Sequence, residues 1–254
     1  MNPHGATIAS GPRKVAIGIA VRYDCYWRRT PTQQALSQPN TEGITLVNTD
    51  ALHQVTDIAT LESIYGAPIN ASIKKEVDYI HPHYRKFIEA APFAVLATSG
   101  PDGLDASPRG DPAGFVRVHD EKTLLLPDRR GNNRIDSLRN IIHDPRLALI
   151  FLIPGIGETV RVNGRGIIST DPDLLAAFSM EGKLPLSVLV IEVDAVFFQC
   201  SRALLRSQLW NPASHVDRST LPSTGTILQA LSNAEIDGHI YDAALPERLK
   251  TTMY

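Results

Sequence analysis

A cationic turn between residues 124 and 134 is the part of this sequence best suited to chemistry. A short apolar run stops at Pro127 and gives way to a polar segment, Asp128, Arg129, Arg130, Gly131, Asn132, Asn133 and Arg134. Behind it, Ile135, Leu138 and Ile141 or Ile142 recur at helical spacing, so a helix is expected over residues 134–142. Free backbone N–H groups and the helix dipole would then point to the same place as the arginines. That geometry suits a phosphate monoester.

The charge of the whole chain limits what this turn can attract. With 25 basic and 27 acidic residues the net charge is −2, which excludes a global field for nucleic acid or an anionic membrane. Between Arg129 and Arg139, however, four arginines face a single carboxylate, Asp136. Any attraction for anions is therefore local. From the turn alone, a solvated surface loop and a phosphate site both remain open.

Length and composition set the class of protein. The 254 residues, 43% of them hydrophobic, suffice for the core of one large or two small domains. Cys25 and Cys200 lie far apart and belong to no metal or redox pattern, which predicts a reduced, cytoplasmic protein. No apolar run approaches the roughly 20 residues that cross a bilayer, so no membrane association is expected.

The composition and residue pattern of the chain change near residue 50. Scattered glycine and proline predict a mobile extension over residues 1–50, and the domain is expected over residues 51–254. Apolar residues repeat every three positions from Leu52 to Ile64, which predicts a helix over residues 50–65. A second helical segment is expected from Asn70, with Pro82 as a break or kink.

From Phe93 the pattern turns to strands. Gly100-Pro101-Asp102-Gly103 predicts a hairpin, and Asn163-Gly164 a bend or separation between strands. Apolar and β-branched runs predict strands over residues 93–99, 104–108, 115–118, 123–126, 146–153, 159–168 and 187–198. Further helices are expected over residues 171–180, 203–209, 226–231 and 236–249. Six or seven closely spaced strands with few helices between them favour a mainly β, antiparallel barrel or sandwich with flanking helices over a βαβ fold.

Other motifs give little support to other chemistries. His81 and His83 could share an ion, but no further ligand stands at a recognisable spacing, so no metal is predicted. Ser99 and Ser107 lack the Gly-x-Ser-x-Gly setting of a nucleophile elbow. Gly155 and Gly157 lack the remaining glycine of a dinucleotide fingerprint. No catalytic acid or base is assigned.

With this order of elements the chain resembles the pyridoxamine 5′-phosphate oxidase-like flavoproteins, which share an antiparallel FMN-binding split barrel. The segments that carry the resemblance are the hairpin Ala94–Gly103, Ala106–Asp111, the strand and turn Leu124–Arg134, Asp144–Phe151, Arg161–Gly166 and Arg202–Trp210. Together they cover roughly residues 50–254. The chain looks most like a subgroup of probable FMN-dependent enzymes.

The resemblance implies a cofactor site residue by residue. It places the FMN phosphate on the turn, at Asp128, Arg129, Arg130, Asn132, Asn133 and Arg134. The strand with Ser107, Arg109 and Asp111 would lie along the isoalloxazine ring and ribityl chain. Trp210 and Arg206 resemble a segment that reaches the flavin of a partner subunit. Where the oxidase has serine, arginine and lysine in its phosphate turn, this chain has Asn132, Asn133 and Arg134.

The resulting expectation is a homodimeric, FMN-dependent oxidoreductase with FMN at the subunit interface and a small-molecule substrate. Two alternatives stay open: a protein that binds or senses flavin without turnover, and a barrel that binds another ligand such as heme. Pyridoxamine-phosphate oxidase activity itself is a weaker alternative because the phosphate turn differs. A deazaflavin in place of FMN is not excluded by the sequence.

Overall fold

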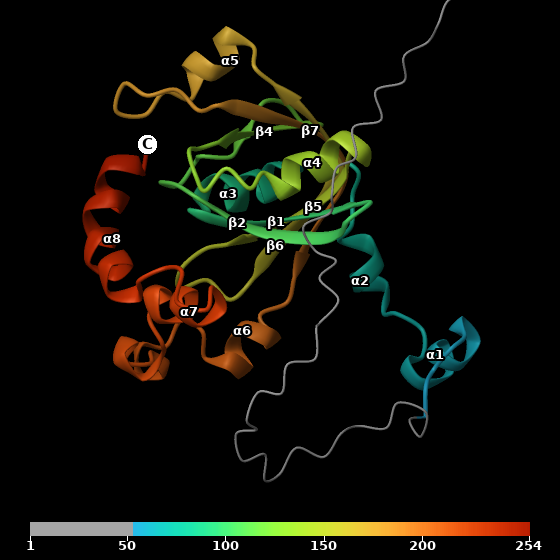
Figure 1. Ribbon diagram of the computed structural model, residues 1–254. Helices are drawn as coiled ribbons and strands as arrows, with labels where there is room; N and C mark the ends of the chain where they lie inside the picture. Colours follow the sequence, from blue (N-terminus) through green and yellow to red (C-terminus); the bar gives the residue numbers. More distant parts are fainter. Residues whose placement is uncertain (1–52) are drawn as a thin grey trace, which may run out of the picture. The chain divides into compact units, whose positions relative to one another are not determined.

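The computed structural model describes residues 53–254 (Figure 1). The predicted mobile extension over residues 1–50 lies outside this range. Contacts divide the chain between Thr60 and Leu61, and residues 61–254 form one compact unit. No helix among the described residues is long and apolar enough to cross a membrane.

In the described part of the chain, seven strands form one antiparallel sheet in the order β2-β1-β5-β6-β7-β4-β3. The strands are β1 (Phe93–Gly100), β2 (Gly103–Gly110), β3 (Arg117–Val118), β4 (Thr123–Asp128), β5 (Arg146–Leu152), β6 (Thr159–Ser169) and β7 (Ser187–Gln199). The sheet is open, because its edge strands β2 and β3 do not pair with each other. The prediction of a mainly β, antiparallel fold with flanking helices is confirmed.

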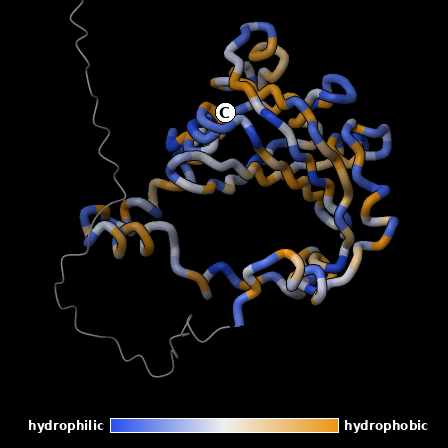
Figure 2. Tube along the Cα trace, turned by 90° about the vertical axis from the view of Figure 1, so that its right-hand side faces the viewer, coloured by the Kyte–Doolittle hydropathy of each residue, from blue (hydrophilic) through white to orange (hydrophobic). Residues whose placement is uncertain are grey.

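The core follows from the alternation of side chains along these strands. On β1 the buried positions are Ala94, Leu96 and Thr98, and on β5 they are Leu147, Leu149 and Phe151. Such alternation puts one face of an antiparallel sheet against the core. Hydrophobic residues accordingly run along the strands, whereas several connecting loops at the periphery are hydrophilic (Figure 2).

The helices of the described residues are α1 (Ile58–Tyr65), α2 (Asn70–Lys74), α3 (Pro82–Ala90), α4 (Asp136–His143), α5 (Pro172–Ala177), α6 (Arg202–Ser207), α7 (Thr224–Leu231) and α8 (Gly238–Thr252). Two of them matter for the site: α3 packs against β3, β6 and β7, and α4 packs against β1, β2 and β6. In Figure 1 both helices lie between the β4–β7 part of the sheet and its β1–β2 part.

Several predicted boundaries were wrong. The helix expected over residues 50–65 begins only at Ile58 in the described range. The segment expected from Asn70 is broken rather than kinked: α2 ends at Lys74, and Pro82 occupies the first turn of α3, where its missing N–H costs no hydrogen bond. Residues 115–118 contain only the two-residue strand β3. The predicted hairpin at Gly100–Gly103 and the bend at Asn163-Gly164 are both present, the latter as a β-bulge.

The strand before the cationic turn also differs from its prediction. It does not stop at Pro127, because β4 continues to Asp128 and Pro127 lies opposite Val188 of β7. A proline is tolerated here because the other neighbour, β3, pairs only with Leu124 and Leu125. The turn therefore begins one residue later than expected.

Candidate functional site

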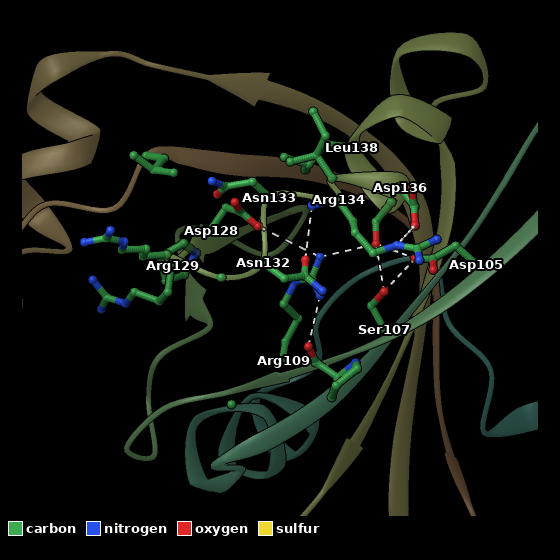
Figure 3. Close-up of a pocket in the computed structure, with 18 of the residues that line it drawn as sticks. Asp105, Ser107, Arg109, Asp128, Arg129, Asn132, Asn133, Arg134, Asp136 and Leu138 are labelled. Carbon is green, nitrogen blue, oxygen red and sulfur yellow. Dashed lines mark hydrogen bonds and ion pairs between the residues drawn. The ribbon is translucent and has the colours of Figure 1, made fainter. Parts of the chain in front are cut away.

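A cleft of about 450 Å³ lies between the end of β4, the start of α4 and one face of β2 (Figure 3). This size is typical of small-molecule sites. Its lining includes the whole predicted turn and two of the three residues predicted on β2: Ser107, Arg109, Asp128, Arg129, Arg130, Asn132, Asn133 and Arg134. The structure thus brings together segments that are about 20 residues apart in sequence.

The β2 side of the cleft is a row of polar side chains. Asp105, Ser107 and Arg109 are spaced two apart, so they point to the same face of the strand. The Ser107 hydroxyl donates to the Asp105 carboxylate at 2.7 Å. The Arg109 guanidinium donates to the Ser137 hydroxyl at 3.3 Å and lies 3.9 Å from an Asp128 oxygen. Arg109 therefore ties β2 to both other walls.

Helix α4 is fixed against the β1–β2 hairpin by two buried polar residues. The Asn140 amide donates to the Thr98 hydroxyl at 3.2 Å, and a Cβ atom on Gly100 would lie 2.1 Å from the Asn140 amide oxygen. At the start of the helix, the Ser137 hydroxyl donates to Asp105. Only a glycine at position 100 leaves room for Asn140 at this distance, so the helix packs closely on the hairpin.

The prediction of which residues of this helix face the core was partly wrong. Ile135 and Ile142 are exposed, and the buried face consists of Ser137, Asn140 and Ile141. The reason is that the helix packs beside the polar row of β2 as well as on the hydrophobic core. The helix also begins at Asp136, two residues later than predicted.

The turn itself adopts an irregular backbone. Asn133 and Ile135 have φ angles of 59° and 52°, in the left-handed region. Asparagine tolerates this region, whereas a β-branched isoleucine is strained there. Ile135 is the residue that precedes α4, and no side chain caps the helix there. The first turn of α4 lines the cleft, and its backbone N–H groups, which have no side-chain cap, are donors suited to an anion.

The arginines of the turn are not equivalent. Arg134 forms an ion pair with Asp136 at 2.8 Å. Arg129 donates to Asp111 at 2.8 Å and to the carbonyl oxygen of Phe178 at 2.6 Å. In the described part of the chain, Arg130 has no hydrogen bond or ion pair with another residue. Arg130 is thus the cation most available to a ligand.

Asp111 lies outside the lining of the cleft. Its side chain is only 2% exposed, and its second oxygen accepts a hydrogen bond of 2.7 Å from the Tyr254 hydroxyl. The Arg129 guanidinium also lies 5.6 Å from the centre of the Tyr254 ring. Asp111 therefore acts on the cleft through Arg129.

Asp105 and Asp128 of the cleft have opposite pKa shifts. Burial raises the pKa of Asp128, and the nearby Arg109 charge offsets only part of this effect. Burial also acts to raise the pKa of Asp105, but hydrogen bonds from Ser137 and Ser107 and the charges of Arg109 and Arg134 outweigh it, so its pKa is lowered. A half-buried carboxyl with a raised pKa, Asp128, thus lines the same cleft as Asp105, which is held ionised.

The remaining two predicted residues lie elsewhere. The Trp210 indole N–H donates to the carbonyl oxygen of Ile156 at 2.8 Å, which anchors the segment after α6 to the loop between β5 and β6. Neither Trp210 nor Arg206 lines the cleft of the single chain. A contact with the flavin of a partner subunit stays a prediction.

Some residues of the cleft were missed at the sequence level. Asp105, Asp136 and Ser137 line it, as do the apolar residues Pro108, Phe115, Pro127, Ile135, Leu138 and Leu186. The two-residue spacing of Asp105, Ser107 and Arg109 could have identified Asp105. Nothing local indicates Ser137 or Leu186, because both reach the cleft only through tertiary packing.

The donor set fits a phosphate ester with an aromatic or apolar body. Four arginines and three aspartates line the cleft, and no carboxylate of residues 53–254 forms an ion pair with Arg130. Asn132 and Asn133 add amide donors, and the start of α4 adds backbone N–H groups. Phe115, Leu138 and Leu186 provide apolar surface for a ring. The residues present are therefore suited to FMN.

A metal centre is not evident among the described residues. There, no group of three histidine, cysteine, aspartate or glutamate side chains is arranged to hold an ion. The centres of the His81 and His83 rings lie 4.9 Å apart, and the backbone N–H of His83 donates to the His81 Nδ1 atom at 3.2 Å. His81 thereby caps the start of α3.

Comparison with known proteins gives one family. The sequence model described as pyridoxamine 5′-phosphate oxidase matches residues 80–200, which span β1 to β7 and the whole cleft. No curated protein matches the chain significantly.

Solved structures of limited similarity include HupZ from Group A Streptococcus, with 20% identity, a TM-score of 0.40 and coverage of 48% of this chain and 95% of that one. An FMN-binding protein from Syntrophomonas wolfei has 10% identity, a TM-score of 0.37 and coverage of 55% and 95%. General stress protein 26 from Bacillus anthracis has 17% identity, a TM-score of 0.35 and coverage of 44% and 88%. At these scores the structures carry no conclusion about a ligand, and the family rests on the match over residues 80–200.

Proposed function

We propose that this chain is an FMN-dependent oxidoreductase acting on a small molecule, because its residues 80–200 match the model of the pyridoxamine 5′-phosphate oxidase family. One observation carries the proposal. The cleft of the family domain is lined by a cationic turn at the start of a helix, and one of its arginines, Arg130, has no partner in the described part of the chain.

The residues of the cleft divide between the two ends of the cofactor. Arg130, Arg134, Asn132 and Asn133 would hold the phosphate together with the N–H groups at the start of α4. Ser107 and Arg109 on β2 would lie along the ribityl chain and ring. Arg129 supports the turn through Asp111, and a direct contact of Asp111 with the cofactor is not part of the proposal.

When bound, FMN would supply the redox chemistry by accepting a hydride or electrons. The protein would orient the ring, exclude water and set the local charge. Asp105, kept ionised, and Arg109 place charges of both signs along β2. Asp128 is the one acidic side chain of the cleft whose pKa is shown to be raised, and it is therefore a candidate to hold a proton near the substrate.

A homodimer with FMN at the subunit interface is part of the proposal. Leu186 borders the cleft with 64% of its surface exposed, and nearby Leu184 is also exposed. Exposed apolar side chains beside a ligand site favour cover by a second subunit. A cytoplasmic location remains a prediction from cysteine usage alone.

The phosphate assignment is tested with Arg130→Gln. FMN and riboflavin are titrated into the purified full-length protein and followed by flavin fluorescence. One lost charge-assisted bond of about 1.5–3 kcal/mol should weaken FMN binding at least tenfold. Riboflavin has no phosphate, so its affinity should be unchanged. Arg85→Gln, at an exposed ion pair on α3, is the matched control and should leave both affinities unchanged.

Three outcomes would overturn the proposal at different levels. Protein that binds neither flavin at saturating concentration would exclude the flavin site. Equal loss of FMN and riboflavin in Arg130→Gln would exclude the phosphate role. If FMN binds but is not reduced anaerobically by nicotinamide dinucleotides or amine donors, the protein is a flavin-binding module rather than an oxidoreductase.

A further inference from the structure

A second cavity, of about 540 Å³, lies outside the flavin cleft and shares no lining residue with it. It is an open pocket between the end of α2, the start of α3, the loop before β6 and the end of β7. Its lining residues are Lys74, Lys75, Val77, His81, His83, Tyr84, Phe87, Glu158 and Phe198. A size of this order is enough for a small organic molecule.

The walls of this cavity are held together before any ligand arrives. Val77 pairs with Val196 of β7 through two backbone hydrogen bonds of 3.1 and 2.7 Å. The Tyr84 hydroxyl donates to the carbonyl oxygen of Lys75 at 2.6 Å, which joins the end of α2 to α3. Since both connections are made within the chain, the cavity does not depend on a ligand for its shape.

The floor of the cavity is aromatic and apolar. Phe87, Tyr84 and Phe198 contribute rings, and Val77 contributes a branched aliphatic side chain. Phe198 keeps 39% of its surface exposed although it lies on the longest strand of the sheet. An exposed ring in a cavity that two other rings also line offers a surface on which a planar molecule can stack.

The rim carries positive charge. The Lys75 ammonium lies 4.9 Å from the centre of the Phe198 ring, a cation–π contact that holds it at the edge of the aromatic floor. Lys74 adds a second ammonium, and Glu158 is the one carboxylate among the lining residues. The formal charge of the lining is thus +1 with both histidines neutral, which complements one acidic group on a ligand.

We propose that this cavity is a second binding site, for a compact aromatic molecule that carries one acidic group such as a carboxylate. The ring of the ligand stacks against Phe198 and Phe87, and its acidic group pairs with Lys75 at the rim. The site is independent of the proposed flavin site, because the two cavities have no residue in common. A purely apolar ligand would leave the rim lysines unpaired, and a purely ionic one would leave the aromatic floor uncovered.

The test uses 2-naphthoate as the probe, titrated into the full-length protein by calorimetry with and without saturating FMN. We expect saturable binding that FMN does not displace. Lys75→Gln keeps most of the side-chain length but removes the charge, and it should weaken 2-naphthoate binding about tenfold. Phe198→Thr, which suits a strand surface, should weaken it by a similar factor. Lys86→Gln on α3, outside the lining, is the matched control and should have no effect.

A neutral analogue separates charge recognition from apolar contact. 2-Naphthalenemethanol should bind the unchanged protein more weakly than 2-naphthoate does. Its affinity for Lys75→Gln should equal its affinity for the unchanged protein. Thermal unfolding checks that each variant is folded. If Lys75→Gln lowers the melting temperature, Lys74→Gln is used in its place. The proposal is overturned if 2-naphthoate shows no saturable binding, if FMN displaces it, or if the lysine variants and Lys86→Gln bind it equally well.

Discussion

Replacing Arg129 by glutamine removes the charge that faces the buried carboxylate of Asp111, beside the cleft. Arg129 is 17% exposed and Asp111 2% exposed, and their side chains meet at 2.8 Å. Arg129 also donates to the carbonyl oxygen of Phe178 at 2.6 Å. In the variant, Asp111 keeps the hydrogen bond from Tyr254, but its buried charge loses its counter-ion.

The magnitude follows from that burial. Removing one partner of a buried ion pair lowers the free energy of unfolding by about 3–5 kcal/mol, because the other charge remains buried without a counter-ion. For a unit of this size, each kcal/mol lowers the melting temperature by about 2–4 °C, so a decrease of roughly 10 °C is expected. Arg129→Gln combined with Asp111→Asn removes both charges, and the double variant should recover about half of the loss.

The assay is urea unfolding at neutral pH without flavin, followed by far-ultraviolet circular dichroism. The two single variants and the double variant form a cycle whose coupling energy should be about 2–3 kcal/mol. Arg85→Gln breaks an exposed pair and should cost less than about 0.5 kcal/mol. A loss below about 1 kcal/mol for Arg129→Gln, or additive single effects, would refute the structural role assigned to this pair.

Four further predictions concern the effect of pH and of single substitutions on stability. Asp105 has a lowered pKa, so its stabilisation is present above the ordinary carboxyl pKa of about 4 and is lost as the pH falls; Asp105→Asn should destabilise at pH 7 but not at pH 3. Asp128 has a raised pKa, so its ionisation lowers the stability of the folded state as the pH rises. Asp128→Asn should therefore raise the melting temperature at pH 7 and leave it unchanged at pH 3. If the two variants do not change the melting temperature at pH 7 in opposite directions, both pKa shifts are contradicted. Ile135→Asn should raise stability by about 1 kcal/mol in chemical unfolding by relieving the left-handed backbone of a β-branched residue, and a loss of stability would exclude strain there. Gly164→Ala would place a Cβ atom 2.2 Å from a carbonyl oxygen of β7 at the bulge and should cost more than about 2 kcal/mol, whereas Gly131→Ala, with open space around it, should unfold like the unchanged protein.

The strands could be predicted because their signals are local. Alternating burial on β1 and β5 and the glycine–proline turn at Gly100–Gly103 are properties of neighbouring residues. The end of β4 was misplaced because a proline is acceptable at a position where only one neighbouring strand pairs, and the sequence does not show which strands are neighbours. The polar face of α4 was missed for a similar reason, since Asn140 and Ser137 are buried only against Thr98 and Asp105.

The sequence by itself determined that a cationic turn follows a buried strand and precedes a helix, because residue type and spacing decide both. It could not rank the arginines of that turn. Their roles depend on partners distant in the chain: Asp111 and Phe178 engage Arg129, and Tyr254 completes that cluster, while Arg130 meets none of them. Only the tertiary structure decided which charge is neutralised and which remains for a ligand, because ion pairing depends on distances in space that only the folded chain defines.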